Sequence, residues 1–113
     1  MDARLEKLRE LNCDIDEALE RFMGDTELYF VCFENLLGDD NLDKLGQALQ
    51  AQDYDNAFHF AHKLKSVYAN MGLTPIYNDC VMIVEPLRAG RTGPHLLESF
   101  GRMKSFMETI RVI

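Results

Sequence analysis

His62 and Lys65 are the two residues of this chain whose types and spacing best suit a chemical reaction. A neutral imidazole, the main form at cytosolic pH, can attack a phosphoryl group without a separate general base. Phosphoryl transfer depends chiefly on positioning and electrostatics, and the phosphorylated product carries close to two negative charges. A lysine three residues further along a helix lies on the same face and offsets that charge. The pair therefore indicates a histidine that accepts a phosphoryl group.

The periodicity of residues 54–71 predicts that His62 is exposed. At about 100° per residue, an apolar stripe is complete without it. The stripe consists of Ala57, Ala61, Leu64, Val67, Tyr68 and Met71. Phe58, His59, Lys65, Ser66 and Ala69 share the side of His62. Because Ser66 and Ala69 are small, a partner's active site has room to close on the histidine, and we expect Phe58, His59 and Ala69 to contact that partner.

Composition excludes several classes of protein. The chain has 113 residues, 47% hydrophobic and 27% charged, which is typical of a globular domain. A net charge of −7 argues against a nucleic-acid partner, because phosphate backbones are bound by clustered Lys and Arg. Cys13, Cys32 and Cys80 are odd in number and lack a CxxC spacing, so we interpret them as reduced packing residues.

The sequence shows neither a signal peptide nor a membrane-spanning segment, which favours a cytoplasmic protein that does not insert into a membrane. Residues 1–10 are charged throughout, unlike a signal peptide, and the longest apolar run, residues 28–33, is too short to span a bilayer. Met1 and the complete helical frame favour a free-standing chain, although excision from a larger membrane-bound sensor is the alternative. A monomer is expected, since no heptad pattern extends beyond the predicted core.

Helical periodicity runs nearly end to end, and no segment alternates as a strand does. The predicted helices cover residues 2–11, 14–22, 26–37 continuing to 49, 54–71, 74–87 and 96–110. Short connections make sequential helices antiparallel neighbours. The sequence therefore predicts a single all-α domain over residues 1–113, an up-down-up-down antiparallel four-helix bundle with an extra N-terminal helical segment.

Several residues mark where these helices begin, bend or end. Asp53 is expected to cap the helix that carries His62, and Thr74-Pro75 predicts a helix with Thr74 at its cap. Residues 38–40 predict a bend or interruption after the unusually apolar segment 26–37. Pro86 predicts a kink or an early end, because proline removes a backbone donor and crowds the preceding turn.

The segment Ala61-His62-Lys63-Leu64-Lys65-Ser66, followed by Gly72, closely resembles the histidine-containing phosphotransfer (HPt) domain of bacterial and fungal phosphorelays. That family has a helical Ala-His-x-Leu-Lys-Gly/Ser motif with a glycine ten residues after the histidine. The resemblance extends to the flanking segments. These are residues 18–25, 27–29, 70–73, Cys80 and 88–90.

The resemblance implies that His62 is the phosphorylated residue and that Lys65 neighbours the phosphoryl group. Ser66 stands where glycine is commoner, and Gly72 takes the place of the structural glycine. The implied partners are a histidine kinase or hybrid kinase and an aspartate-bearing receiver domain, which supplies Mg²⁺ and carboxylates. The chain would then be a phosphoryl carrier and not an enzyme, and it would need no cofactor and no metal of its own.

Two positions depart from the family pattern. Val84, with Glu85 beside it, stands near the place where the family often has a polar residue that steadies the imidazole. Pro86 is also foreign to the pattern. In addition, a minority of the apolar side chains in residues 26–37, together with Phe58, are expected to form an exposed patch around His62 that docks the receiver.

Two other functions compete with phosphotransfer. His59 and His62 are three residues apart with Asp55 one turn earlier, a spacing that lets one helix supply two metal ligands. Such a site lacks inward carboxylates, because the predicted core stripe is apolar. The second alternative is a non-catalytic helical adapter or dimerisation module that retains the fold, against which His62 and Lys65 both argue.

Overall fold

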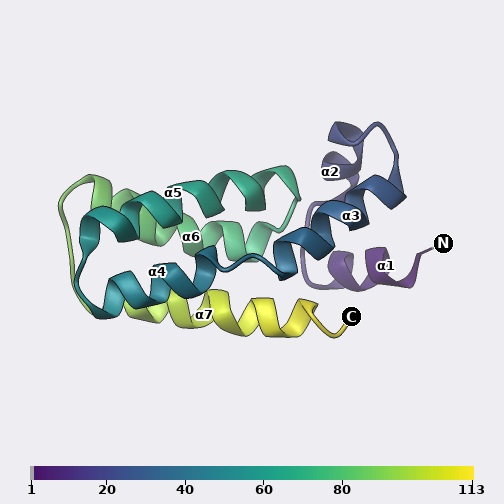
Figure 1. Ribbon diagram of the computed structural model, residues 1–113. Coiled ribbons are helices and arrows are strands. Elements are labelled where there is room, and N and C mark those ends of the chain that lie inside the picture. The colour runs from purple at the N-terminus through teal and green to yellow at the C-terminus, as the bar shows by residue number, and fades with distance from the viewer. Residues whose placement is uncertain (1) are drawn as a thin grey trace.

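The computed structural model describes residues 2–113, which form seven α-helices and no strand (Figure 1). The helices are α1 (Ala3–Glu10), α2 (Ile15–Arg21), α3 (Thr26–Leu37), α4 (Asn41–Gln50), α5 (Tyr54–Asn70), α6 (Thr74–Arg88) and α7 (His95–Ile110). The all-α prediction is therefore confirmed. Over the same residues, no helix combines the length and the hydropathy that a membrane crossing requires.

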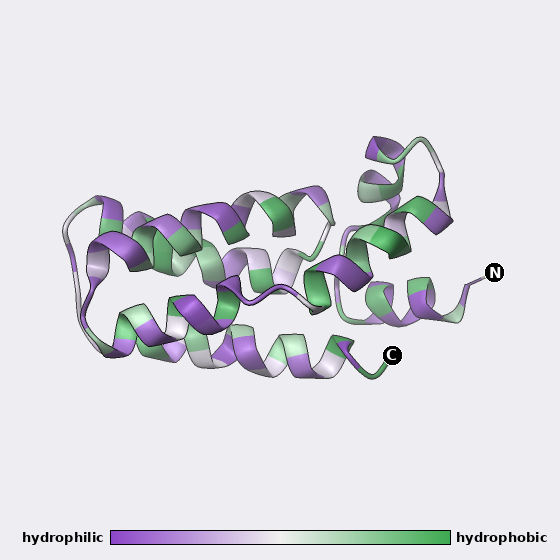
Figure 2. Cartoon of the chain, in the orientation of Figure 1, coloured by the Kyte–Doolittle hydropathy of each residue, from purple (hydrophilic) through white to green (hydrophobic). Residues whose placement is uncertain are grey.

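Helices α4 to α7 form a bundle in which neighbours in sequence are neighbours in space. α5 packs against α4 and α6, α6 packs against α7, and α7 also contacts α4, so the four helices enclose one core (Figure 1). The buried core includes apolar side chains of all four helices, and Figure 2 shows hydrophobic residues recurring along each of them. α4 and α7 approach closely at Gly46, because a Cβ atom there would overlap the ring of Phe100.

The predicted interruption at residues 38–40 is a complete break between two helices. α3 ends at Leu37, and α4 begins at Asn41, whose backbone N–H donates to the Asp39 carboxylate at 2.6 Å. α3 lies with α1 and α2 at one end of the bundle (Figure 1). The segment expected over residues 26–49 is therefore divided at the predicted interruption, and α4 is the part that joins the bundle.

The C-terminal end of α5 is held by groups from the N-terminal helices. Carbonyl groups at a helix end have no partner within the helix. Here Arg21 donates to the carbonyls of residues 69 and 70 at 2.6 and 3.2 Å, and the Tyr29 hydroxyl donates to that of Met71 at 2.7 Å. The backbone N–H of Asp14 donates to the Gly72 carbonyl at 2.8 Å. These four bonds fix the N-terminal helices onto α5.

The junction has no room for a side chain at residue 72. Gly72 has a φ of +70°, a conformation that glycine adopts without steric cost. A Cβ atom there would overlap the carbonyl oxygen of Asp14 and lie 2.9 Å from the Cβ of Ala18. The glycine is therefore what allows the chain after α5 to touch the start of α2.

The other helix boundaries agree in part with the sequence. Asp53 caps α5, as predicted, by accepting from the backbone N–H of Asn56. Thr74 is not a cap: α6 begins at Thr74, so the cap is Leu73, and the Thr74 hydroxyl instead donates to the Gly72 carbonyl at 3.4 Å. α6 continues through Pro86 and ends two residues later at Arg88, so the helix does not stop at the proline.

Two buried tyrosines allow the α5 junction to be tested. Tyr29 and Tyr68 are both fully buried, but the Tyr68 hydroxyl has no hydrogen-bond partner among residues 2–113. Tyr29→Phe leaves the Met71 carbonyl without its partner and is expected to lower the free energy of unfolding by about 1–2 kcal/mol. Tyr68→Phe is expected to change it by less than about 0.5 kcal/mol, or to raise it. Urea unfolding of both variants checks this difference, and equal losses would contradict it.

Alanine substitutions at Gly72 and Gly90 distinguish the cost of steric overlap from the cost of backbone strain. Gly72→Ala is expected to lower the free energy of unfolding by more than about 2 kcal/mol, because strain and overlap both apply. Gly90→Ala is the control, since Gly90 has a φ of +73° and open space around its Cβ position. Strain alone there predicts a loss of about 1 kcal/mol. A Gly72 variant no less stable than the Gly90 variant would show that the close approach to Asp14 is unimportant.

Candidate functional site

His62 lies in the middle of α5 with its side chain exposed, as predicted. Phe58, one turn earlier, packs beside it, with 5.7 Å between the ring centroids and 32° between the ring planes. The buried side of α5 is made of Ala57, Ala61, Leu64 and Tyr68. Val67, which the sequence placed in that stripe, is 40% exposed and lies at its edge.

Cys80 fixes α6 to α5 next to the histidine. Its thiol donates to the backbone carbonyl of Ala61 at 3.1 Å. Burial raises the pKa of Cys80 to about 12 and that of Cys13 to about 11. Both thiols therefore stay protonated at neutral pH, which agrees with their interpretation as packing residues.

A cluster of three charged side chains joins α5 to α6 at Lys65, three residues after His62. Lys65 Nζ lies 3.7 Å from one carboxylate oxygen of Glu85, and Arg88 Nε lies 3.5 Å from the other. The Arg88 guanidinium also lies 5.4 Å from the centroid of the Phe58 ring. Lys65, on the helix that carries His62, is thus paired with a carboxylate of α6. The sequence pointed to Lys65 but did not predict the contacts that Glu85 and Arg88 make. The only local signal was that Glu85 and Arg88 are three residues apart on one helix, a spacing at which opposite charges pair.

The small residues predicted next to His62 leave its face open. Ser66 and Ala69 are both exposed. The hydroxyl of Ser66 makes a long hydrogen bond of 3.5 Å to the backbone carbonyl of His62. Val84 is fully buried in the core, which leaves Glu85 as its exposed neighbour on α6.

The two histidines of α5 have different neighbours. His59 is exposed and its ring packs against Phe60, with 5.7 Å between centroids, whereas His62 packs against Phe58. Within residues 2–113, no three His, Cys, Asp or Glu side chains gather closely enough to hold a metal ion.

The apolar surface near His62 is divided in two. Cys32 and Leu36 of α3 form a shallow groove with Val67 of α5. Phe58 lies on the other flank, in a groove with Leu87 and Arg88. The patch of α3 side chains and Phe58 around His62 stays a prediction, and in the structure its two parts line separate grooves.

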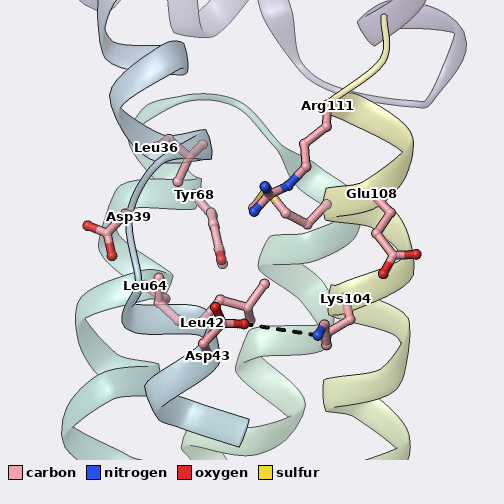
Figure 3. Close-up of a pocket in the computed structure, with 10 residues that line it drawn as sticks. Leu36, Asp39, Leu42, Asp43, Leu64, Tyr68, Lys104, Glu108 and Arg111 are labelled. Atoms are coloured by element: carbon pink, nitrogen blue, oxygen red, sulfur yellow. Dashed lines mark ion pairs between the residues drawn. The ribbon is translucent and has the colours of Figure 1, made fainter.

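A further cavity lies at the break between α3 and α4, on the core side of α5 (Figure 3). The Tyr68 side chain points into it, and Asp43 and Lys104 at its edge are 4.0 Å apart. Its wall of exposed charged residues places it at the surface between α4 and α7, and because Leu64 and Tyr68 lie on the buried side of α5, it is separate from the candidate site.

Comparison with protein families gave one match. A family model described as the Hpt domain matches residues 37–110, from the last residue of α3 to the end of α7. The match covers well over half of the chain and includes His62 and its neighbours. α1 and α2 lie outside it. Comparisons with curated proteins and with solved structures gave no match.

Proposed function

Because the chain belongs to the Hpt domain family, we propose that it is a phosphoryl carrier whose His62 exchanges a phosphoryl group between a histidine kinase or hybrid kinase and the aspartate of a receiver domain. Hpt domains act in phosphotransfer in two-component signalling, together with kinases and receiver domains. They are carriers, so catalysis comes from the partners. The observation that carries the proposal is an exposed histidine beside Lys65, inside the segment that matches the family.

The transfer step uses the free base of His62. A ring nitrogen attacks the phosphorus of the donor with its lone pair, an N–P bond forms, and the donor's bond to phosphorus breaks. The electron pair of the broken bond leaves with the donor, and the proton on the other ring nitrogen stays on the imidazole through both steps. In the onward step, a receiver carboxylate attacks the same phosphorus and His62 leaves as the free base. Lys65 offsets the charge of the intermediate between these steps.

The open face of α5 supports access by a folded partner. Phe58, His59, Ser66 and Ala69 surround His62, and none of them is large enough at the surface to cover it. We infer that Phe58, His59 and Ala69 contact the receiver. Transient complexes of this kind need only a modest interface, so the face of one helix with its two flanking grooves is sufficient.

The proposal extends to the architecture. We infer that α4 to α7 alternate in direction as an up-down-up-down bundle, since each is joined to the next by a short connection. We further infer that residues 1–113 act as one domain, because the N-terminal helices hold the end of α5. A cytoplasmic monomer, bound only transiently by its partners, is the form in which this carrier would act.

Labelling with a phosphodonor tests the role of His62. Wild-type protein is expected to take up one phosphoryl group per chain, with the acid lability and base stability of phosphohistidine. His62→Gln is expected to abolish the label, because His62 is the histidine of the segment that resembles the family motif. The control is His59→Gln, which should be labelled like wild type. Thermal unfolding of both variants checks that they fold. A label that persists in the His62 variant would refute the mechanism.

Lys65→Ala tests the electrostatic role. Labelling of the chain is expected to slow by about tenfold, which corresponds to about 1.4 kcal/mol. Stability should change little, since a partly exposed ion pair contributes less than about 1 kcal/mol. Lys63→Ala is the control, because Lys63 lies on the α3 side of the helix. Stopped-flow or quench kinetics measure the rates, and equal rates for both variants would exclude this role.

A further inference from the structure

We propose that Glu85 is a positioning residue that holds Lys65 beside unphosphorylated His62, releases it to the arriving phosphoryl group, and thereby limits the lifetime of the phosphohistidine. This inference rests on the proposed function of His62. It concerns a residue that neither the motif around His62 nor the family match singles out.

The contacts of Glu85 place it between the two cations of the site. One of its carboxylate oxygens lies 3.7 Å from Lys65 Nζ, across the interface between α6 and α5, and the other lies 3.5 Å from Arg88 Nε. Lys65 is the most shielded of the three, with 27% of its side chain exposed against 49% for Glu85 and 51% for Arg88. Glu85 therefore restrains a lysine that already has limited freedom.

The balance of charge explains why Lys65 would leave Glu85 for a phosphoryl group on His62. Glu85, Lys65 and Arg88 together carry a net charge of +1 before phosphorylation, counted from one anion and two cations. A phosphoryl group adds about two negative charges. Partly exposed carboxylate–lysine pairs are weak, whereas a doubly charged phosphoryl group forms shorter, stronger bonds to an ammonium. Lys65 is thus expected to turn from Glu85 to the phosphoryl group.

The same carboxylate then opposes the phosphorylated state. After transfer, Glu85 still carries its negative charge within the same cluster, beside a group of like sign. It also competes for Lys65 and Arg88. The cluster would therefore keep Lys65 ready before transfer and make the phosphoryl group easier to remove afterwards, as a carrier in a relay requires. Glu85 itself forms no bond to phosphorus and exchanges no proton.

Glu85→Gln tests this inference in the full chain. The protein is phosphorylated on His62 with phosphoramidate, and the decay of phosphohistidine is followed by ³¹P NMR. The glutamine keeps the shape of the side chain but frees Lys65 and Arg88, so the half-life is expected to lengthen by about threefold or more. Because the effect is electrostatic, the ratio of the two half-lives should fall toward one in about 1 M salt.

Two further variants separate positioning from a purely structural role. Glu85→Asp keeps the charge and should restore a half-life close to that of wild type. In a Lys65→Ala background, Glu85→Gln should lose most of its effect, because the two residues act through one contact. Asp79→Asn is the control: it removes the same charge from the same helix, where Asp79 pairs with Arg102 at 2.8 Å, and should leave the half-life unchanged.

The outcomes distinguish this inference from the function on which it rests. If wild-type protein is labelled on His62 and Glu85→Gln leaves the half-life unchanged or shortens it, the role of Glu85 is refuted and the carrier function stands. A full effect of Glu85→Gln in the Lys65→Ala background would also refute it, since the carboxylate would then act without Lys65. If phosphoramidate and a kinase both fail to label His62, the carrier function fails and this inference fails with it.

Discussion

The hydrogen bonds at the C-terminal end of α5 are the constraint on which the rest of the structure depends. A helix end exposes carbonyl groups that need partners, and here Arg21, Tyr29 and the backbone of Asp14 supply them. Gly72 makes the approach of Asp14 sterically feasible. These bonds tie α1, α2 and α3 to the helix that carries His62.

Fixing α3 at the end of α5 has consequences along the chain. α3 cannot also lie along the bundle, so the chain breaks at residues 38–40 and α4 alone completes the ring with α5, α6 and α7. The break opens the cavity beside Tyr68 and leaves α3 in contact with only part of α5. The outer face of α5 at His62 is left exposed among residues 2–113.

The candidate site combines an exposed nucleophile with a shared set of charges. In the proposed transfer, His62 would need no general base and the partner that closes on it would supply catalysis, so the requirements of the site would be access and a nearby positive charge. α5 provides access through Ser66 and Ala69. α6 contributes Glu85 and Arg88, whose position relative to Lys65 is fixed by the packing of α6 on α5 and by the bond from Cys80 to the Ala61 carbonyl.

Much of this protein was predictable from its sequence because helices are set by local periodicity and capping. The all-α class, the exposure of His62, the position of Lys65 on the same face and the cap at Asp53 all follow from residues within a few turns of one another. The family resemblance rested on the same local segment, and the family match from residue 37 to residue 110 agrees with it.

Only the tertiary structure decided which distant residues meet. The bonds from Arg21 and Tyr29 to α5 join residues 48 and 42 positions apart, and no periodicity within one helix reveals such partners. The same holds for Lys65 and Glu85, the division of the apolar surface around His62, and the exposure of Val67. The sequence by itself determined which face of α5 carries the chemistry. Helix packing decided what surrounds that face, because the path of each connection, and not the pattern within a helix, sets which helices become neighbours.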